Sequence, residues 1–408
     1  MPHVATRSFG APRHWKGVRR ALGATLWLAT FVAAGTEKTL EKQKPEKPAG
    51  SEHTCVVLVA GGVKCWGANF SGQLGDGTNV NRNTPVTVAG VAGSVSAIAS
   101  GSEHTCALST GGAAVCWGAN FSGQLGDGTN INRNTPVNVS GLAGGVPAIA
   151  AGAEHTCAVT AGGVKCWGAN AAGQLGDGTN VNRNAPASVP ALPGSVISIA
   201  AGSAHMCALT TDGSIWCWGA NFSGQLGDGT NVNRNTPVRV SGLLGGVLEI
   251  AAGSEHTCAL TRGGALACWG ANFAGQLGDG TTVKRNAPVM IVSGLSRPVT
   301  GIAAGSEHTC ALVAGGVKCW GANFSGQLGD GTNVNRSTPV SVSGIAGGVS
   351  EVLAGSSHTC ALSTSGAMVC WGANFSGQLG DGTNLSRSTP IDVPGLPTVR
   401  PSVRTRIL

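Results

Sequence analysis

Apolar residues fall in short runs along the chain, each bounded by Gly, Asn or Ser, and no helical period connects them. In one representative stretch this pattern predicts strands at Val95–Gly101, His104–Ser109, Val115–Gly118 and Pro136–Ser140. A long Gly-rich loop, Ala119–Thr135, separates the last two. Four short strands in succession are typical of one blade of a β-propeller. The first strand is rich in small residues, which fits the crowded innermost position of a blade.

The same stretch recurs seven times. The Gly that follows the repeated Trp stands at Gly67, Gly118, Gly168, Gly219, Gly270, Gly321 and Gly372. The period is therefore about 51 residues, which indicates an array of repeated units. We predict an all-β fold, a seven-bladed β-propeller with four short strands per blade, over residues 51–403. One Trp per repeat, such as Trp117, is expected to pack against a neighbouring blade.

The two ends of the array predict how the ring closes. A charged segment precedes Ser51, so the first repeat lacks an innermost strand. Residues 395–403 align with the part of the other repeats that contains that strand. We therefore predict that the C-terminal segment supplies the missing strand of the first blade.

The repeated motifs resemble those of a known family. Most copies contain His-Thr-Cys-Ala-Leu, a Gly-containing turn, Cys-Trp-Gly-x-Asn, Gly-Gln-Leu-Gly-Asp-Gly-Thr and a Pro-Val strand. This combination resembles the repeats of the regulator of chromosome condensation (RCC1) family, over residues 51 to about 403, and its paired cysteines resemble a secreted bacterial type. The resemblance implies a seven-bladed propeller. The family includes an exchange factor, a plant photoreceptor and a secreted β-lactamase inhibitor, so membership leaves the function open.

The first 50 residues predict export. Basic residues precede an apolar run, Ala21–Ala34, that is too short to span a bilayer comfortably, so residues 1–34 are predicted to be a secretory signal. An uncleaved membrane anchor is the alternative. Residues 35–50 are predicted to be a charged disordered linker, and residues 404–408 a short tail. The expected location is secreted or periplasmic, with no stable membrane span after cleavage.

The net charge of +7 does not indicate nucleic-acid binding. Residues 1–50 carry nine Lys or Arg against three Asp or Glu, whereas residues 51–390 carry 14 basic and 15 acidic residues. A nucleic-acid binder would carry its basic excess on the folded part. We therefore expect no nucleic-acid partner.

All 14 cysteines belong to the repeats, two in each, on either side of a predicted hairpin turn. A spacing of nine or ten residues allows the two to lie opposite each other. An oxidising compartment favours disulfides, each worth at most about 2–3 kcal/mol. Metal binding by His-Thr-Cys with the second Cys, or free thiols in a cytoplasm, are the alternatives. The predicted pairs are Cys55–Cys65, Cys106–Cys116, Cys157–Cys166, Cys207–Cys217, Cys258–Cys268, Cys310–Cys319 and Cys360–Cys370.

No catalytic residue, cofactor site or metal site is predicted. One His recurs in every repeat, and seven equivalent copies indicate a structural role, a buried His that bonds to backbone, because a catalytic centre is normally single. In the loop 75–82, Asp76 and Arg82 are expected to pair. Calcium binding by its Asp, Thr and Asn oxygens is the alternative.

Two sets of residues are candidates for partner binding. One loop position carries Phe70, Phe121, Phe222, Phe273, Phe324 and Phe375, with Ala171 in the third repeat. We favour the interpretation that these side chains fill gaps between blades; an exposed aromatic ring that binds sugar or protein is the alternative. Departures from the consensus mark where a unique partner would be recognised, with drift as the alternative. They are Ala171, Ala172, Ala204, Met206, Trp216, Arg239, Arg262, Lys284 and Arg297.

The sequence therefore predicts a non-enzymatic, secreted, monomeric propeller that needs no cofactor and binds a protein partner. Inhibition of a secreted or envelope enzyme is one form of that function. A multivalent lectin-like binder of surface glycan is the first alternative. A guanine-nucleotide exchange regulator is the second, and the predicted export argues against it.

Overall fold

The computed structural model describes residues 50–91, 95–243, 245–291, 293–295 and 298–401. The predicted secretory signal, the predicted linker up to residue 49 and the predicted tail lie outside these residues. All regular secondary structure in the described residues is β-strand.

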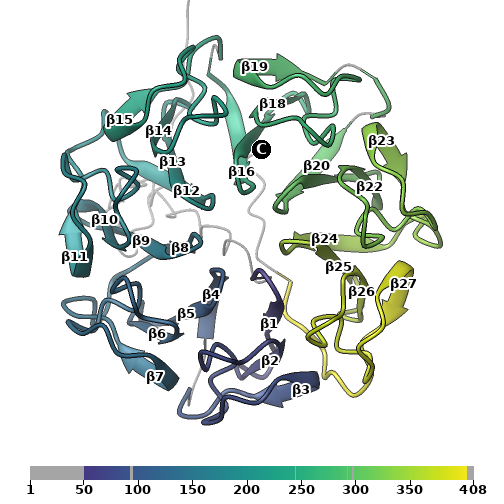
Figure 1. Cartoon of the computed structure of the whole chain (residues 1–408), viewed down its shortest axis with the longest axis horizontal. Coiled ribbons are helices and arrows are strands. Elements are labelled where there is room, and N and C mark those ends of the chain that lie inside the picture. Colours follow the sequence, from purple (N-terminus) through teal and green to yellow (C-terminus); the bar gives the residue numbers. More distant parts are fainter. Residues whose placement is uncertain (1–49, 92–94, 244, 292, 296–297, 402–408) are drawn as a thin grey trace, which may run out of the picture. The chain divides into compact units, whose positions relative to one another are not determined.

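Antiparallel strands form seven separate sheets that follow one another around a ring (Figure 1). Within a sheet, neighbouring strands are consecutive in the sequence. Blade 1 contains β1 to β3, and each of blades 2 to 7 contains the next four strands. The prediction of a seven-bladed propeller with four short strands per blade is confirmed, with three strands assigned in blade 1.

The strands occupy four positions from the centre of the ring to its rim. The innermost are β4 (Val95–Ser100), β8 (Ala148–Ala151), β12 (Val196–Ala201), β16 (Val247–Ala252), β20 (Val299–Ala304) and β24 (Val349–Ala354). The second are β1 (His53–Val57), β5 (His104–Ser109), β9 (His155–Thr160), β13 (His205–Thr210), β17 (His256–Thr261), β21 (His308–Val313) and β25 (His358–Ser363). The third are β2 (Val63–Gly67), β6 (Ala114–Gly118), β10 (Gly163–Gly168), β14 (Ile215–Gly219), β18 (Leu266–Gly270), β22 (Gly316–Gly321) and β26 (Met368–Gly372). The outermost are β3 (Arg82–Thr87), β7 (Arg133–Asn138), β11 (Arg183–Ser188), β15 (Arg234–Arg239), β19 (Arg285–Met290), β23 (Arg336–Ser341) and β27 (Arg387–Asp392).

The predicted outermost strand was misplaced. It was expected at Pro136–Ser140, but β7 begins at Arg133, because Gly118 pairs with Arg133 after a bulge in the ladder. Pro136 therefore lies inside the strand, which is tolerated because an outermost strand has one unpaired edge. The other three strands lie within one residue of their predicted positions.

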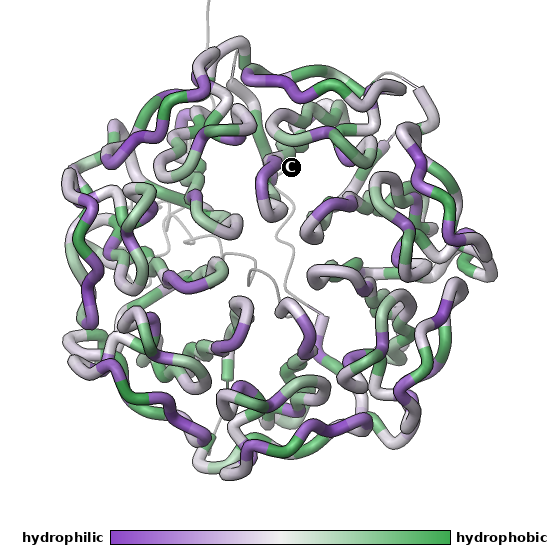
Figure 2. Tube along the Cα trace, in the orientation of Figure 1, coloured by the Kyte–Doolittle hydropathy of each residue, from purple (hydrophilic) through white to green (hydrophobic). Residues whose placement is uncertain are grey.

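Most side chains on both faces of the three inner strands of a blade are buried, because each blade packs between two others, whereas the outermost strand is half-buried to exposed. The second strand reads His-Thr-Cys-Ala-Leu in most blades, and those five positions are buried throughout. Hydrophilic residues instead mark the turns nearest the centre and the start of the outermost strands (Figure 2). Trp117 is fully buried, and its indole N–H donates to the Gln73 carbonyl of the preceding blade at 2.9 Å. The predicted packing of Trp117 between blades is confirmed.

The turn between the innermost and second strands requires glycine. A Cβ at Gly101 would overlap both the His104 ring and the carbonyl oxygen of Gly152 in the next blade. The equivalent glycine of the last blade, Gly355, approaches the Gly50 carbonyl in the same way. These seven glycines let the turns crowd around the central channel.

The C-terminal segment lies beside the first blade. Leu58 and Val399 form an isolated antiparallel bridge, and the Arg400 N–H donates to the Val57 carbonyl at 2.9 Å. In five of the other six blades the residue equivalent to Leu58 pairs with the first residue of an innermost strand, as Ser109 does with Val95. Residues 402–403, where the predicted strand ends, lie outside the described residues.

Candidate functional site

The ring has two faces with different chemistry. Turns 101–103 and loops such as 119–132 lie at one end of each blade, and we call this end the loop face. The hairpin turns such as 110–113, and the connections between blades, lie at the other end, which we call the hairpin face.

The seven recurring histidines are fully buried next to the central channel. In six of them, Nε2 lies 2.8–2.9 Å from the hydroxyl of a Thr in the next blade. Each of these hydroxyls donates its own proton to a Gln carbonyl, as Thr105 does to Gln73, so the His must carry its proton on Nε2 and donate it. The predicted structural role is therefore supported, but in these six blades the predicted bonding to backbone was wrong, because Nε2 donates to a side-chain hydroxyl.

Four histidines of this belt stay neutral at ordinary pH because their pKa is lowered. Burial, with the neighbouring histidines, lowers the pKa of His53 and of His308 to about 3. Burial lowers the pKa of His104 and of His358 to about 4. In blade 4, Met206 replaces the Thr and supplies no hydroxyl to the belt.

The seven predicted disulfides are present. Cys106 and Cys116 are directly opposed in the ladder, and the paired Cα atoms lie 4.0–4.1 Å apart in all seven hairpins. None of the cysteines in the described residues is free. Seven disulfides are typical of a protein that folds in an oxidising, extracellular environment.

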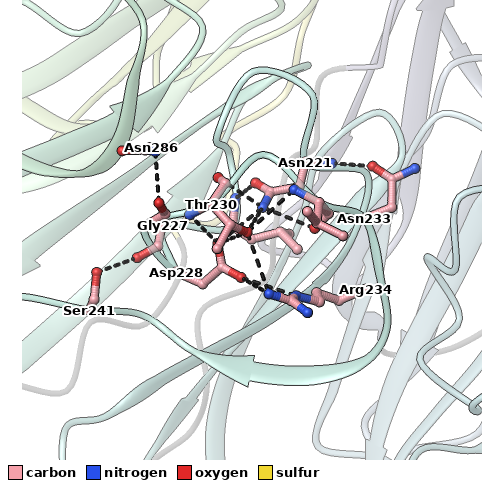
Figure 3. Close-up of polar contacts among 11 residues, drawn as sticks. Asn221, Gly227, Asp228, Thr230, Asn233, Arg234, Ser241 and Asn286 are labelled. Atoms are coloured by element: carbon pink, nitrogen blue, oxygen red, sulfur yellow. Dashed lines mark hydrogen bonds and ion pairs between the residues drawn. The ribbon is translucent and has the colours of Figure 1, made fainter.

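One hydrogen-bond network fixes each long loop, and Figure 3 shows it in blade 4. Asp228 Oδ1 accepts from the Thr230 N–H and hydroxyl, while Arg234 lies 2.9 Å from Oδ2. The buried side chain of Asn221 donates to Asp228 and to the Thr230 and Val232 carbonyls. Burial raises the pKa of the Asp228 carboxyl, but bonds from Thr230 and Arg234 outweigh it and hold that pKa below its usual value.

The predicted pairing of Asp and Arg is thus confirmed in all seven loops. The Asp carboxylate that calcium would need is already held by Arg and Thr. Among the residues that the structure describes, no three His, Cys, Asp or Glu side chains form a group that could hold a metal ion.

The recurring phenylalanines do not fill gaps between blades. Their exposed fractions are 71–75 %, so the favoured interpretation was wrong and the alternative, an exposed aromatic ring, holds. A second apolar position in each loop, ten residues further on, is 57–63 % exposed. Sequence reasoning missed it, although an apolar residue recurs there in all seven copies. We call the thirteen side chains the apolar crown: Phe70, Val80, Phe121, Ile131, Val181, Phe222, Val232, Phe273, Val283, Phe324, Val334, Phe375 and Leu385.

The loop face also carries glutamates around the mouth of the channel. Five of them are exposed: Glu52, Glu103, Glu154, Glu255 and Glu307. A loop Ser of the preceding blade donates to four of these carboxylates at 2.7–2.9 Å. The channel mouth at this face holds a hollow of about 40 Å³ that is lined by Gly, Ser and Ala of the turns.

Four departures from the consensus gather at one junction of the loop face. The loop position that carries Phe and Ser in blade 1 holds Ala171 and Ala172 in blade 3. The turn of blade 4, where that Ser would find its glutamate, holds Ala204, and Met206 follows two residues later. The crown and the ring of carboxylates are therefore both interrupted between blades 3 and 4. Lys284, on the loop face of blade 5, donates to the Phe222 carbonyl at 3.1 Å.

The hairpin face carries the side chains that differ most from blade to blade. The start of the third strand pairs there with the end of the outermost strand. The seven pairs are Lys64–Thr87, Val115–Asn138, Lys165–Ser188, Trp216–Arg239, Ala267–Met290, Lys318–Ser341 and Val369–Asp392. Arg262 is exposed in the hairpin turn of blade 5. The structure therefore brings the candidates Trp216 and Arg239 together and places Arg262 on the same face, whereas Arg297 lies outside the described residues.

Comparison with known proteins identifies the family. The family model described as RCC1-like domain matches residues 144–406, more than half of the chain. The chain belongs to this family. The model of the regulator of chromosome condensation (RCC1) repeat also matches residues 60–108 and 112–159.

Two relatives of this RCC1-like chain are eukaryotic proteins. The ultraviolet-B receptor UVR8 of Arabidopsis thaliana is 34% identical over 347 residues, which cover 84% of this chain and 68% of the receptor. The human E3 ubiquitin-protein ligase HERC2 is 34% identical over 306 residues, which cover 72% of this chain but 6% of the ligase. The secreted bacterial type stays a prediction.

Solved structures with the same fold include human WBSCR16, with a TM-score of 0.73 and 26% identity, over 80% of this RCC1-like chain and 92% of that one. Yeast RCC1 (Prp20), solved with Kap60 bound, has a TM-score of 0.74 and 22% identity, over 93% of this chain and 91% of that one. Its similarity concerns the fold alone. No helix in the described ranges has the length and apolar character needed to cross a membrane.

Proposed function

We propose that this RCC1-like propeller is a non-enzymatic scaffold, secreted or periplasmic and monomeric, that binds one protein partner through its hairpin face. The observation that carries the proposal is the variety of the seven cross-strand pairs on that face, where only blades 3 and 6 share a combination, Lys with Ser. A partner without sevenfold symmetry needs a surface on which most blades differ from one another. The loop face is nearly the same in every blade and does not offer one.

Blades 4 and 5 hold the residues best suited to a binding hot spot. Trp216 and Arg239 are cross-strand neighbours, and Trp and Arg are the types most enriched in hot spots. Arg239 is exposed and donates to Ser214 at 3.2 Å, which fixes its guanidinium beside the sheet. Leu248 and Met290 add exposed apolar surface to the same end of blade 5.

The test is affinity capture from the culture medium and extract of the host cell, with the full chain as bait. We expect one protein at about equal stoichiometry, lost with W216A/R239A and kept with K165A/S188A, which changes the equivalent pair of blade 3. Equal capture by both variants would refute the assignment of the hairpin face. Inhibition of a secreted or envelope enzyme is one form of this function, and assay of a captured enzyme with added propeller tests it.

A lectin-like function is the second candidate, supported by grooves between neighbouring blades. One groove, of about 370 Å³, is lined by Ser122 and Asn130 of blade 2 and by Asn182, Arg183 and Asn184 of blade 3. A groove at the equivalent place lies between blades 4 and 5. Release of the captured material by free sugar would favour this candidate. Guanine-nucleotide exchange, the remaining alternative, requires a reducing compartment in which seven disulfides would not persist.

A further inference from the structure

We propose that the loop face docks on the surface of a zwitterionic lipid bilayer through the apolar crown. This function is separate from recognition of a protein by the hairpin face. It rests on the exposure, the repetition and the charge of the crown.

The crown holds most of the exposed apolar side chains. Sixteen large apolar residues among those the structure describes are exposed, and thirteen of them belong to the crown. The other three, Val59, Leu248 and Met290, lie at the hairpin face. Exposed apolar side chains that gather on one face of a protein mark a site that contacts another apolar surface.

The loops present these side chains in a fixed way. The Asn79 side chain donates to the Phe70 carbonyl at 2.9 Å, which ties the two apolar positions of one loop together. Asn134 of the next blade donates to the Gly77 carbonyl at 2.9 Å, so each loop is also tied to its neighbour. Little conformational freedom is therefore left to lose when the crown meets a surface.

Repetition favours a planar surface over a protein. Six phenylalanines at equivalent positions have exposed fractions within 71–75 %, so six of the seven blades present the same aromatic side chain to solvent in the same way. The second position varies among Val, Ile and Leu, but it is apolar and exposed in every blade. A folded protein without sevenfold symmetry matches only one or two such tips, whereas a bilayer presents the same chemistry to all of them.

Charge selects the kind of lipid. The crown side chains and the residues directly next to them in sequence are uncharged apart from Lys284. Each loop Arg is paired with an Asp. The exposed glutamates at the channel mouth add negative charge to the same face. Anionic lipids would be repelled, since a juxtaposed basic cluster is what attracts them. Phosphatidylcholine is therefore the occupant that the face fits.

The first experiment measures cosedimentation of the full chain with phosphatidylcholine vesicles. The variant F273S/F324S/F375S removes three adjacent aromatic tips. We expect its partition coefficient to fall about tenfold or more, because three aromatic side chains leave the contact. The matched control V59S/L248S/M290S changes the three exposed apolar residues of the hairpin face and should bind as the unchanged chain does. Equal loss in both variants, or no binding of the unchanged chain, would overturn the proposal.

The second experiment locates the contact independently of residues 21–34, which are apolar themselves. The variants F324W and M290W place a new indole on the loop face and on the hairpin face. Vesicles of phosphatidylcholine brominated in the acyl chains should quench the additional fluorescence of F324W and leave that of M290W unchanged. The existing tryptophans are common to both variants, so the difference reports the new one. Quenching of neither or of both, or binding that requires phosphatidylserine, would contradict docking by the crown.

Discussion

His358 of the last blade and Thr54 of the first are 304 residues apart in sequence, yet His358 Nε2 lies 2.8 Å from Thr54 Oγ1. The same Thr54 hydroxyl donates to the Gln378 carbonyl at 3.0 Å, and Trp66 donates to that carbonyl at 2.9 Å. The same contacts join the remaining pairs of neighbouring blades. The junction between blades 3 and 4 differs, because Met206 replaces the Thr there. The last and first blades are therefore joined by the same types of hydrogen bond as the other neighbouring blades.

The variant T54V tests this junction. It keeps the volume of the side chain but leaves His358 Nε2–H and the Gln378 carbonyl with one bond fewer, so we expect a loss of about 1–3 kcal/mol and a lower melting temperature. The control T87V removes an exposed hydroxyl that Lys64 contacts and should change stability by less than about 0.5 kcal/mol. Equal melting temperatures for the two variants would show that the belt does not hold the ends together.

Deletion of residues 395–408 tests the role of the C-terminal segment. Val399 is buried against Leu58 in the core between the last and first blades, and its removal exposes the edge of β1. We expect a sharp fall in the melting temperature, measured by calorimetry on the oxidised chain. The variant V399A, which keeps the backbone bonds, should lose less. A deletion that melts with the unchanged chain would mean that the segment does not complete the first blade.

Much of the fold could be predicted because the same sequence pattern recurs in all seven repeats. Gly at the central turn, Cys opposite Cys and one Trp per repeat each fix a backbone position, and their agreement leaves few alternatives. The start of the outermost strand at Arg133 could not be predicted from this pattern. The repeat pattern predicts that the outermost strand starts at the proline three residues later, whereas the bulge after Cys116, which moves the start to Arg133, has no signal in the sequence of a single repeat.

The functional surface was harder to predict, because the repeat pattern does not say which side chains face solvent. Phe70 follows the buried Asn69, and a large aromatic residue beside a buried one is expected to be buried too. Phe70 is exposed, whereas the Asn69 side chain turns inward and bonds Asp76, Thr78 and Val80 across the loop. The grouping of Ala172 and Ala204 depends on a contact between neighbouring blades that joins positions 32 residues apart in sequence, as in the equivalent Ser–Glu pairs, and only the structure shows it.

The buried histidines predict how stability depends on pH. A His buried neutral has a lower pKa in the folded chain than in the unfolded chain, where it is about 6.5. Between the two values the unfolded chain binds more protons, so stability is complete above about pH 6.5 and falls as the pH drops towards the folded values of about 4 for His104 and His358 and about 3 for His53 and His308. The loop Asp residues, whose pKa is lowered, add a further loss below their usual range.

Melting temperatures at intervals between pH 7.5 and 3 check this expectation. The variant H104Q leaves one titrating group fewer and should show a shallower fall between about pH 6 and 4, although it is less stable at neutral pH. A profile that is flat down to pH 4 in the unchanged chain would contradict neutral burial of the belt.

Removal of one loop carboxylate tests whether the network holds the crown in place. In D228N the Arg234 ion pair is lost and the Thr230 N–H keeps a weaker, neutral acceptor, so we expect a loss of about 1–2 kcal/mol. Hydrogen exchange, followed by mass spectrometry, should quicken in residues 226–234 and stay unchanged in the equivalent loop of blade 6. The control D212N changes an exposed Asp of the hairpin turn in the same blade, and exchange in residues 226–234 should not respond to it.

The variant D228N also tests whether a fixed loop strengthens membrane binding. Because the crown side chains Phe222 and Val232 belong to this loop, D228N should bind phosphatidylcholine vesicles more weakly than the unchanged chain. Unchanged exchange in D228N would mean that the loop is held by the Asn221 bonds alone.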